Sequence, residues 1–319
     1  MKGAQRIDLH RHLDGNIRIG TILELADQNG VVLPATDVEG LRPFVTITTP
    51  QPGLMDFLAK FEWSMRVLAT PDDCRRVAFE NVEDAAREKL DGVELRFSPL
   101  FMAREHGLDP AAVVEAVADG VAAGVEKFGV PACLIGILSR TFGVEDCSRE
   151  LDALLAFREK ITALDLAGDE AGFPPALFVE HFRKGRDAGW RVTVHAGEAA
   201  GPQSVRDAIE LLGAVRIGHG IRSIKDPALL DLLAERGIGL ECCPTSNVQT
   251  STVASYSGYP LREFLRRGIL ATLNTDDPGI SGIDFDHELQ VAAPACGLDS
   301  EEIRQCLANA RAITFLEER

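Results

Sequence analysis

The chain has 319 residues, 45% of them hydrophobic and 26% charged, a composition that is typical of a globular enzyme and excludes a disordered chain. Its formal net charge of −16 argues against nucleic acid or an anionic membrane surface as a partner, because both would repel it. The seven scattered cysteines include no C-x-x-C pair, the first residues show no apolar leader, and no apolar run reaches the roughly 20 residues that span a bilayer. We therefore expect a cytoplasmic protein with reduced cysteines.

Short runs of apolar and β-branched residues recur along the chain and predict parallel strands that are covered on both faces. These runs are residues 6–10, 92–97, 133–138, 161–166, 191–195, 215–218, 238–242 and 270–274. Helical patterns separate them, at residues 72–89, 110–128, 149–160, 175–188, 205–212, 227–236 and 260–267. Gly189, Gly237 and Gly268 each lie between a predicted helix and the next strand, where a helix-ending glycine is expected.

Eight repeats of strand and helix predict a (β/α)8 TIM barrel, with residues 1–319 in one domain. The alternative is an open doubly wound sheet, which normally has fewer strands and a phosphate-binding glycine turn. Neither G-x-G-x-x-G after the first strand nor a P-loop is present. An apolar, helical insertion at residues 30–70 separates the first two strands, and it is predicted either to cover a pocket or to pack outside the barrel.

Four of the seven histidines lie at or just after the end of a predicted strand: His10, His12, His195 and His219. In a (β/α)8 barrel these strand ends form the rim that carries the catalytic residues. Residues i and i+2 of a strand point to the same side, so His10 and His12 can chelate one metal ion. Taken alone, an H-x-H pair is equally compatible with histidines that are only hydrogen-bonded.

Carboxylates complete this pattern at the same rim. Glu198 follows His195 after a glycine, and Asp276 and Asp277 are adjacent after the eighth predicted strand, where they repel each other unless a cation or hydrogen bonds compensate. Imidazole and carboxylate ligands with an open position for water suit a catalytic zinc ion, whereas no cysteine pair is available for a structural one. The sequence therefore predicts a barrel of the metal-dependent hydrolase type.

These segments resemble the adenosine deaminase family, most closely its bacterial members. The similar segments, in the family's order, are Leu9-His10-Arg11-His12-Leu13-Asp14-Gly15, Asp165-Leu166-Ala167-Gly168-Asp169-Glu170, Val194-His195-Ala196-Gly197-Glu198, Ile217-Gly218-His219-Gly220 and Leu273-Asn274-Thr275-Asp276-Asp277-Pro278. The resemblance implies hydrolytic deamination of adenosine and 2′-deoxyadenosine in purine salvage, with one Zn2+ per chain. It implies a purine nucleoside as the small-molecule partner and no obligatory protein partner.

The resemblance also implies a role for each site residue. The zinc ligands would be His10, His12, His195 and Asp276. Glu198 would donate a proton to N1 of the purine, and His219 would orient and help to deprotonate the attacking water. Substrate contacts are implied for His12, for Asp14 at the ribose 5′-hydroxyl, for the backbone N–H of Gly168 at N3 and for Asp277 at N7.

Three alternatives remain open from the sequence. An adenine deaminase is the first, although such relatives tend to carry Glu where Asp14 stands. A deaminase of a larger or modified nucleoside is the second, and the insertion would decide it. A barrel that only binds is the third, but it would be expected to have lost Glu198, His219 or a metal ligand. The other histidines, His106, His181 and His287, are predicted to be surface or capping residues.

Overall fold

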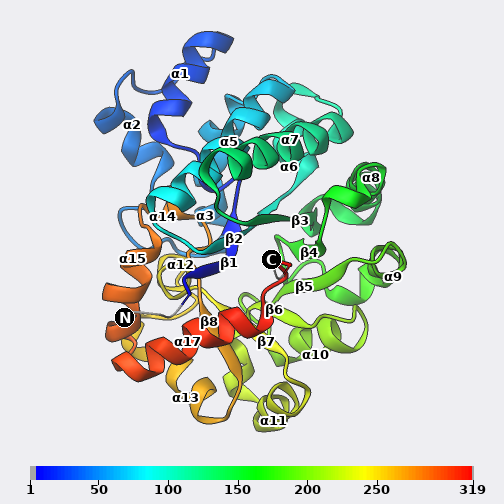
Figure 1. Cartoon of the computed structure of the whole chain (residues 1–319), viewed down its shortest axis with the longest axis vertical. Coiled ribbons are helices and arrows are strands. Elements are labelled where there is room, and N and C mark those ends of the chain that lie inside the picture. Colours follow the sequence, from blue (N-terminus) through cyan, green and yellow to red (C-terminus); the bar gives the residue numbers. More distant parts are fainter. Residues whose placement is uncertain (1–4, 318–319) are drawn as a thin grey trace.

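The computed structural model describes residues 5–317 and contains eight parallel strands that follow one another around the sheet in chain order (Figure 1). The strands are β1 (Ile7–His12), β2 (Gly92–Phe97), β3 (Ala132–Ser139), β4 (Ala163–Ala167), β5 (Arg191–Ala196), β6 (Arg216–His219), β7 (Gly239–Cys242) and β8 (Leu270–Leu273). Each overlaps one predicted run, and the ends differ by only a few residues.

The segment after β8 returns to β1 and completes the barrel. The backbone N–H of His12 donates to the carbonyl of Asp276 at 2.7 Å, and the N–H of Asp276 donates to the carbonyl of His10 at 2.8 Å. The predicted (β/α)8 barrel is therefore confirmed, and the open doubly wound sheet is excluded. This junction also holds the two predicted metal-binding segments, His10–His12 and Asp276, directly against each other.

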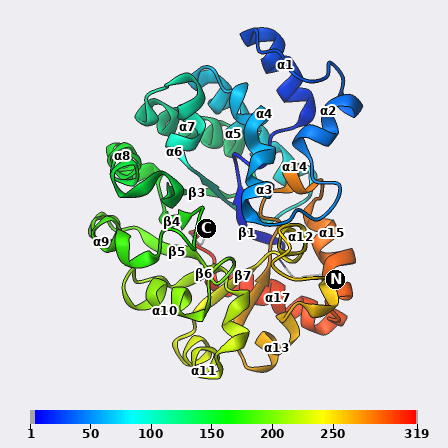
Figure 2. The ribbon, with the colours of Figure 1, turned by 180° about the vertical axis from the view of Figure 1, so that it is seen from behind.

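Helices surround the barrel, and α1 and α2 project furthest from it in both views (Figures 1 and 2). The helices are α1 (Ile19–Asn29), α2 (Val38–Val45), α3 (Leu54–Leu58), α4 (Glu62–Arg66), α5 (Pro71–Arg87), α6 (Pro99–Ala103), α7 (Pro110–Phe128), α8 (Gly143–Ala156), α9 (Val179–Asp187), α10 (Pro202–Glu210), α11 (Pro227–Arg236), α12 (Pro244–Gln249), α13 (Leu261–Arg266), α14 (Pro278–Ser281), α15 (Phe285–His287), α16 (Ala293–Ala295) and α17 (Ser300–Ile313). No helix within residues 5–317 is long and apolar enough to cross a membrane.

Helix boundaries follow the local signals where those signals are strong. Helices α7 and α11 have the predicted bounds, because each starts with an Asp–Pro pair whose aspartate caps the first turn and each ends at a left-handed glycine. Helix α8 begins and ends a few residues earlier than the helix predicted at 149–160. Acidic residues in its first turn favour the earlier start, and residues 158–160 form a separate 3-10 turn.

The insertion between β1 and β2 is helical, as predicted. It contains α2, α3, α4 and a short 3-10 turn, η1 (Ala59–Phe61). Phe57 and Phe61 are buried, and together with Leu58 they line a cavity that also contains the predicted site residues. The insertion therefore covers a pocket and does not merely pack against the outside of the barrel.

Buried charges fill much of the barrel interior. The Arg216 guanidinium lies 2.6 Å from Glu94 Oε2 and 2.7 Å from Glu241 Oε1, and all three side chains are inaccessible to solvent or nearly so. The segment after α17 covers this layer, because the Phe315 ring packs 3.5 Å from Arg216 Cζ and Thr314 Oγ1 donates to Glu94 at 2.7 Å. One guanidinium thus compensates two carboxylates below the rim of the barrel.

Replacing Arg216 with Met should lower the free energy of unfolding by about 3–5 kcal/mol, because the buried Glu94 loses its counter-ion and Glu241 keeps only Arg96. Urea unfolding followed by circular dichroism measures this. Arg183→Met is the matched control, since Arg183 pairs with Glu180 and Asp187 at the surface and its removal should leave the transition essentially unchanged. Equal midpoints for wild type and Arg216→Met would contradict the assignment of this ion pair to the stability of the barrel.

Candidate active site

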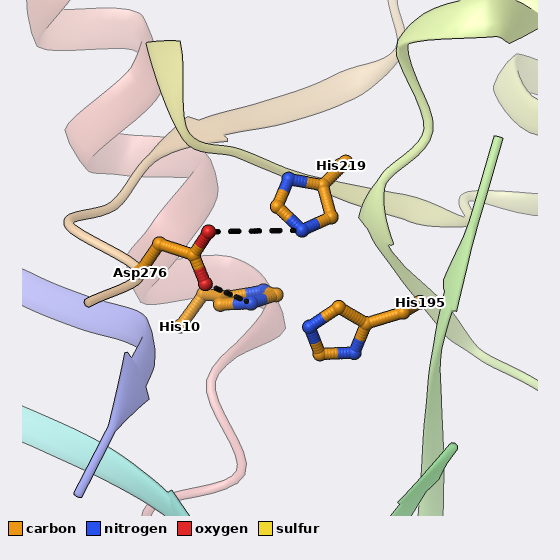
Figure 3. A group of neighbouring side chains, drawn as sticks. All are labelled: His10, His195, His219 and Asp276. Atoms are coloured by element: carbon orange, nitrogen blue, oxygen red, sulfur yellow. Dashed lines mark ion pairs between the residues drawn. The ribbon is translucent and has the colours of Figure 1, made fainter. Parts of the chain in front are cut away.

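Four side chains converge at the C-terminal rim of the barrel, on β1, β5, β6 and the segment after β8 (Figure 3). The ligand atoms of His10, His195, His219 and Asp276 all lie within 4.8 Å of one another. His10 Nε2 is 3.0 Å from Asp276 Oδ1. His12 joins them, with its Nε2 3.2 Å from His195 Nε2 and 3.3 Å from Asp276 Oδ1. The structure therefore brings the four predicted ligands together, with His219 beside them.

Two buried carboxylates orient the rings of His10 and His195 and so determine which nitrogen of each ring faces the cluster. His10 Nδ1 donates to Glu241 Oε2 at 2.8 Å, and His195 Nδ1 donates to Asp165 Oδ2 at 3.0 Å. Burial lowers the pKa of His195 to about 3 in spite of the neighbouring Asp165, so this ring is neutral near pH 7. A neutral ring that donates through Nδ1 keeps a lone pair on Nε2, which is the form in which histidine binds a metal.

Arg96 of β2 connects these two carboxylates. Its Nη1 lies 2.9 Å from Asp165 Oδ2, and its Nη2 lies 2.8 Å from Glu241 Oε2. Nη2 also donates to the backbone carbonyl of Leu9 at 2.8 Å. Because the guanidinium is planar and rigid, it fixes the spacing of the two carboxylates, and through them the spacing of the His10 and His195 rings.

The donor set fits a divalent metal ion. His10 Nε2 is buried and makes no hydrogen bond within the described residues, which is unfavourable unless an ion meets its lone pair. Negative charge is in excess around His12: burial alone would lower its pKa, but the neighbouring carboxylates, Asp277 foremost, raise it to about 9. Inward lone pairs and surplus negative charge are both stabilised by a cation.

The backbone is strained where β6 ends and where the chain leaves β8. His219 has φ of 61° and Asp276 has φ of 66°, in the left-handed region that residues other than glycine rarely adopt. Gly218 has no room for a side chain, because a Cβ there would lie 2.9 Å from Cε1 of His10. The glycine therefore makes room for the ring of His10.

Glu198 lies in the loop after β5 and faces the same space. Four consecutive backbone N–H groups, those of residues 197–200, donate to the carboxylate of Glu170 and hold this loop in place. Asn247 Nδ2 donates to Glu198 Oε1 at 2.9 Å and lies 3.1 Å from His219 Nδ1. Burial raises the pKa of Glu198, against the opposing effect of His219, so Glu198 is suited to hold a proton beside the cluster.

A cavity of about 270 Å³ opens beside these groups. The predicted substrate residues Asp14, Gly168 and Asp277 all line it. Oδ1 of Asp14 and Oδ1 of Asp277 are buried without a hydrogen-bond partner in the part of the chain that the structure describes. Apolar side chains of the insertion form another part of the wall. The cavity therefore offers unsatisfied oxygen atoms to a ligand that combines an apolar surface with polar groups.

The sequence interpretation did not identify the residues behind the rim. Arg96, Asp165 and Glu241 place buried charges inside otherwise apolar strands, and this interruption was the available signal. Glu170 and Asn247 carried no comparable signal, because Glu170 lies in a polar loop and Asn247 in the short polar helix α12. The predicted surface or capping role of His181 is wrong: its ring is buried where α9 packs against α8, 2.8 Å from Ser148 Oγ and 3.1 Å from the carbonyl of Val144.

A (β/α)8 barrel with a histidine–aspartate cluster and a buried carboxylic acid at its C-terminal rim defines a hydrolase with a candidate metal centre. The family model for adenosine deaminase matches residues 6–319. The adenosine deaminases of Salmonella paratyphi C and Salmonella typhimurium are each 60% identical over 311 residues, which is 98% of this chain and 93% of theirs. The chain belongs to the adenosine deaminase family and is an enzyme that hydrolytically deaminates adenosine.

Solved structures share this fold. The adenine deaminase of Arthrobacter aurescens superposes with a TM-score of 0.91 at 29% identity, over 99% of this chain and 95% of that one. An amidohydrolase of Burkholderia ambifaria, solved with bound zinc, gives a TM-score of 0.88 at 25% identity, over 99% of this chain and 86% of that one. The much higher identity to adenosine deaminases than to this adenine deaminase favours the nucleoside over the free base.

Arg96→Lys should weaken binding of a divalent metal by about 10- to 100-fold, because Lys keeps the charge but cannot hold both carboxylates behind the histidines. Competition with a chromophoric chelator measures the affinity, and circular dichroism checks that the barrel remains folded. Arg183→Lys at the surface is the control and should bind as the wild type does. An Arg96→Lys protein that is folded and binds the metal with unchanged affinity would rule out this role.

Proposed function

We propose that the chain is a zinc-dependent enzyme of purine salvage that converts adenosine and 2′-deoxyadenosine, with water, to inosine and 2′-deoxyinosine and ammonia. The observation that carries the proposal is the convergence of three histidines and Asp276 beside a buried Glu198, in a cavity of nucleoside size. One Zn2+ per chain would be held by His10, His12, His195 and Asp276. When bound there, zinc supplies an activated water near neutral pH and stabilises developing negative charge.

Glu198 is the proton donor to N1 of the purine in this proposal. The C6 amino group of adenine is a poor leaving group on an aromatic ring, and protonation at N1 makes C6 electrophilic. Asn247 donates to Oε1 of Glu198, which leaves Oε2 to carry the proton and deliver it. The raised pKa of the buried Glu198 supports this assignment, since a general acid must still hold its proton at neutral pH.

His219 orients the attacking water through Nε2, because Asn247 Nδ2 can only donate, so Nδ1 accepts and the proton of the neutral ring lies on Nε2. Its Nε2 lies 3.8 Å from Asp276 Oδ2 and 3.6 Å from Glu198 Oε2, so the ring stands between the proposed metal ligands and the proposed acid. Asn247, 3.1 Å from Nδ1, fixes the ring plane. The strained φ of His219 supports the assignment, because strain of this kind is retained where a side chain must point in one direction.

The substrate is held by groups on three sides of the proposed metal site. Asp14 accepts a hydrogen bond from the 5′-hydroxyl through its unpartnered Oδ1, and His12, 3.6 Å away, adjoins the same position. Gly168 presents its backbone N–H to N3, and Asp277 meets N7. Because N7 is only an acceptor, Asp277 must be protonated to bind it, and burial beside Asp276 raises the pKa of Asp277 in that direction.

The proposal extends to the setting of the enzyme. Residues 1–319 form one domain, the enzyme works in the cytoplasm, and it needs no nucleic acid, membrane or obligatory protein partner. The net charge of −16 supports the exclusion of anionic partners. A neutral nucleoside is not repelled by this charge.

Assays of the purified enzyme with adenosine, 2′-deoxyadenosine and adenine test the proposal directly. We expect turnover of both nucleosides, little or none of adenine, and zinc in the purified protein by elemental analysis. Chelation should abolish activity, and added zinc should restore it. Activity on adenine alone would overturn the nucleoside assignment, and full activity after verified metal removal would overturn the metal-dependent mechanism.

Glu198→Gln should bind zinc as the wild type does but lose about 10²- to 10⁴-fold in kcat, because Gln has the shape of the acid without its transferable proton. Steady-state kinetics with adenosine and a zinc determination on the same sample measure both properties. A variant that keeps its zinc and remains within about tenfold of wild-type kcat would show that another group is the acid.

A further inference from the structure

A pair of serine hydroxyls, those of Ser98 and Ser139, lines the cavity between Asp14 and Gly168. Ser98 follows β2 and caps α6, and Ser139 is the last residue of β3. Both line the cavity, and their hydroxyl oxygens are 2.8 Å apart. Ser98 is almost fully buried, whereas Ser139 is only partly buried, so Ser139 is the serine of the pair that a ligand can reach.

Behind the two serines lies Glu150 of α8, whose side chain is fully buried. Ser98 Oγ donates to Glu150 Oε1 at 2.5 Å, and the backbone N–H of Ser139 donates to Glu150 Oε2 at 2.6 Å. Burial raises the pKa of Glu150 to about 7, partly offset by these hydrogen bonds. A carboxylate therefore stands directly behind a hydroxyl chain that leads to the cavity wall.

The protonation state of Glu150 determines what the row of hydroxyls presents to a ligand. When Glu150 is ionised it can only accept, so the single hydroxyl hydrogen of Ser98 is used on Glu150 and that of Ser139 is used on Ser98. Ser139 then offers lone pairs to the cavity. When Glu150 is protonated the chain can run in the opposite sense, and Ser139 offers a hydrogen instead. Only a ligand group that both donates and accepts satisfies Ser139 in either state, and a hydroxyl is such a group.

The position of the pair indicates which hydroxyl of the ligand it meets. The backbone N–H of Ser98 donates to Asp14 Oδ2 at 3.2 Å, so the pair adjoins the residue proposed to hold the 5′-hydroxyl. Around the barrel it lies on β2 and β3, between Asp14 after β1 and Gly168 after β4. In a nucleoside held by N3 at one end and the 5′-hydroxyl at the other, the polar groups between them are O4′ and the secondary hydroxyls of the ribose, and only the hydroxyls both donate and accept.

We infer that Ser139, positioned through Ser98 by the buried Glu150, forms a subsite that hydrogen-bonds a secondary ribose hydroxyl of the substrate. This inference rests on the proposed function, because it takes the orientation of the nucleoside from it. Ser139 contacts the substrate directly, whereas Glu150 is a positioning residue that acts through the two hydroxyls. The contact is made equally in the ground state and the transition state, so it affects KM more than kcat.

The test compares adenosine, 2′-deoxyadenosine and 3′-deoxyadenosine as substrates of wild type and Ser139→Ala. Ser139→Ala should lower kcat/KM for adenosine about three- to tenfold, mainly through KM, since a neutral hydrogen bond is lost. It should leave kcat/KM unchanged for whichever deoxynucleoside lacks the contacted hydroxyl, which identifies that hydroxyl as 2′ or 3′. The other deoxynucleoside should respond as adenosine does.

Glu150→Gln should also reduce the preference for adenosine over that same deoxynucleoside, a ratio that a general loss of folded protein does not change. Ser257→Ala, an exposed serine outside the cavity, is the matched control and should behave as the wild type. Equal losses of kcat/KM on all three substrates in Ser139→Ala, or no loss on any, would overturn the subsite and leave the deaminase function standing. A wild-type enzyme inactive on every nucleoside would instead overturn the proposed function.

Discussion

The double contact of Arg96 with Asp165 and Glu241 is the interaction on which the active site depends. Both carboxylates are fully buried, and without a counter-ion their mutual repulsion and lost hydration would favour protonation or a rearranged interior. A protonated carboxyl would be a weaker acceptor for Nδ1 of the adjoining histidine, and a displaced one could not accept from it. The orientation of His10 and His195 is therefore a consequence of charge balance in the barrel, set by a residue that contacts neither substrate nor reacting atom.

The compensation of buried charges continues along the barrel axis. Glu241 is shared between Arg96 and Arg216, so the layer near the rim and the layer covered by Phe315 belong to one hydrogen-bonded network. Most barrel interiors of this fold are filled by branched apolar side chains. Here the interior carries ion pairs instead, and a change in one layer alters the electrostatics of the next. Stability and catalytic geometry are thus coupled in this protein more tightly than in a barrel with an apolar interior.

Much of the fold was predictable because its signals are local. Most strands are rich in apolar and β-branched residues, and α7 and α11 are bounded by Asp–Pro starts and glycine ends that need no tertiary context. The inward-facing site residues were predictable for a related reason, since the topology brings all strand ends to one rim. The partners of those residues were not. Arg96 meets Glu241 across 145 positions of sequence, and only the closed barrel reveals which charge faces which.

Side-chain orientation outside the strands was equally hidden. Asn247 lies in a polar segment after β7, and nothing in that segment indicates that its amide joins Glu198 to His219. His181 shows the opposite case: its place in a polar helix predicts a surface position, but the ring is buried, because one sequence does not show which helix faces pack together. Periodicity and strand ends locate a site in the fold, whereas the protonation and direction of its groups depend on contacts between distant segments.

The cover formed by residues 54–61 has a consequence for how this family can diversify. Its cavity-lining side chains, among them Phe57, Leu58 and Phe61, come from one short stretch of chain between the first two strands, apart from every residue that handles a proton. Substitutions within this stretch can reshape the space around a substituent on the nucleoside while the reaction itself stays intact. This part of the pocket wall is consequently encoded apart from the proposed metal ligands and the proposed acid, so it can change in sequence without altering them.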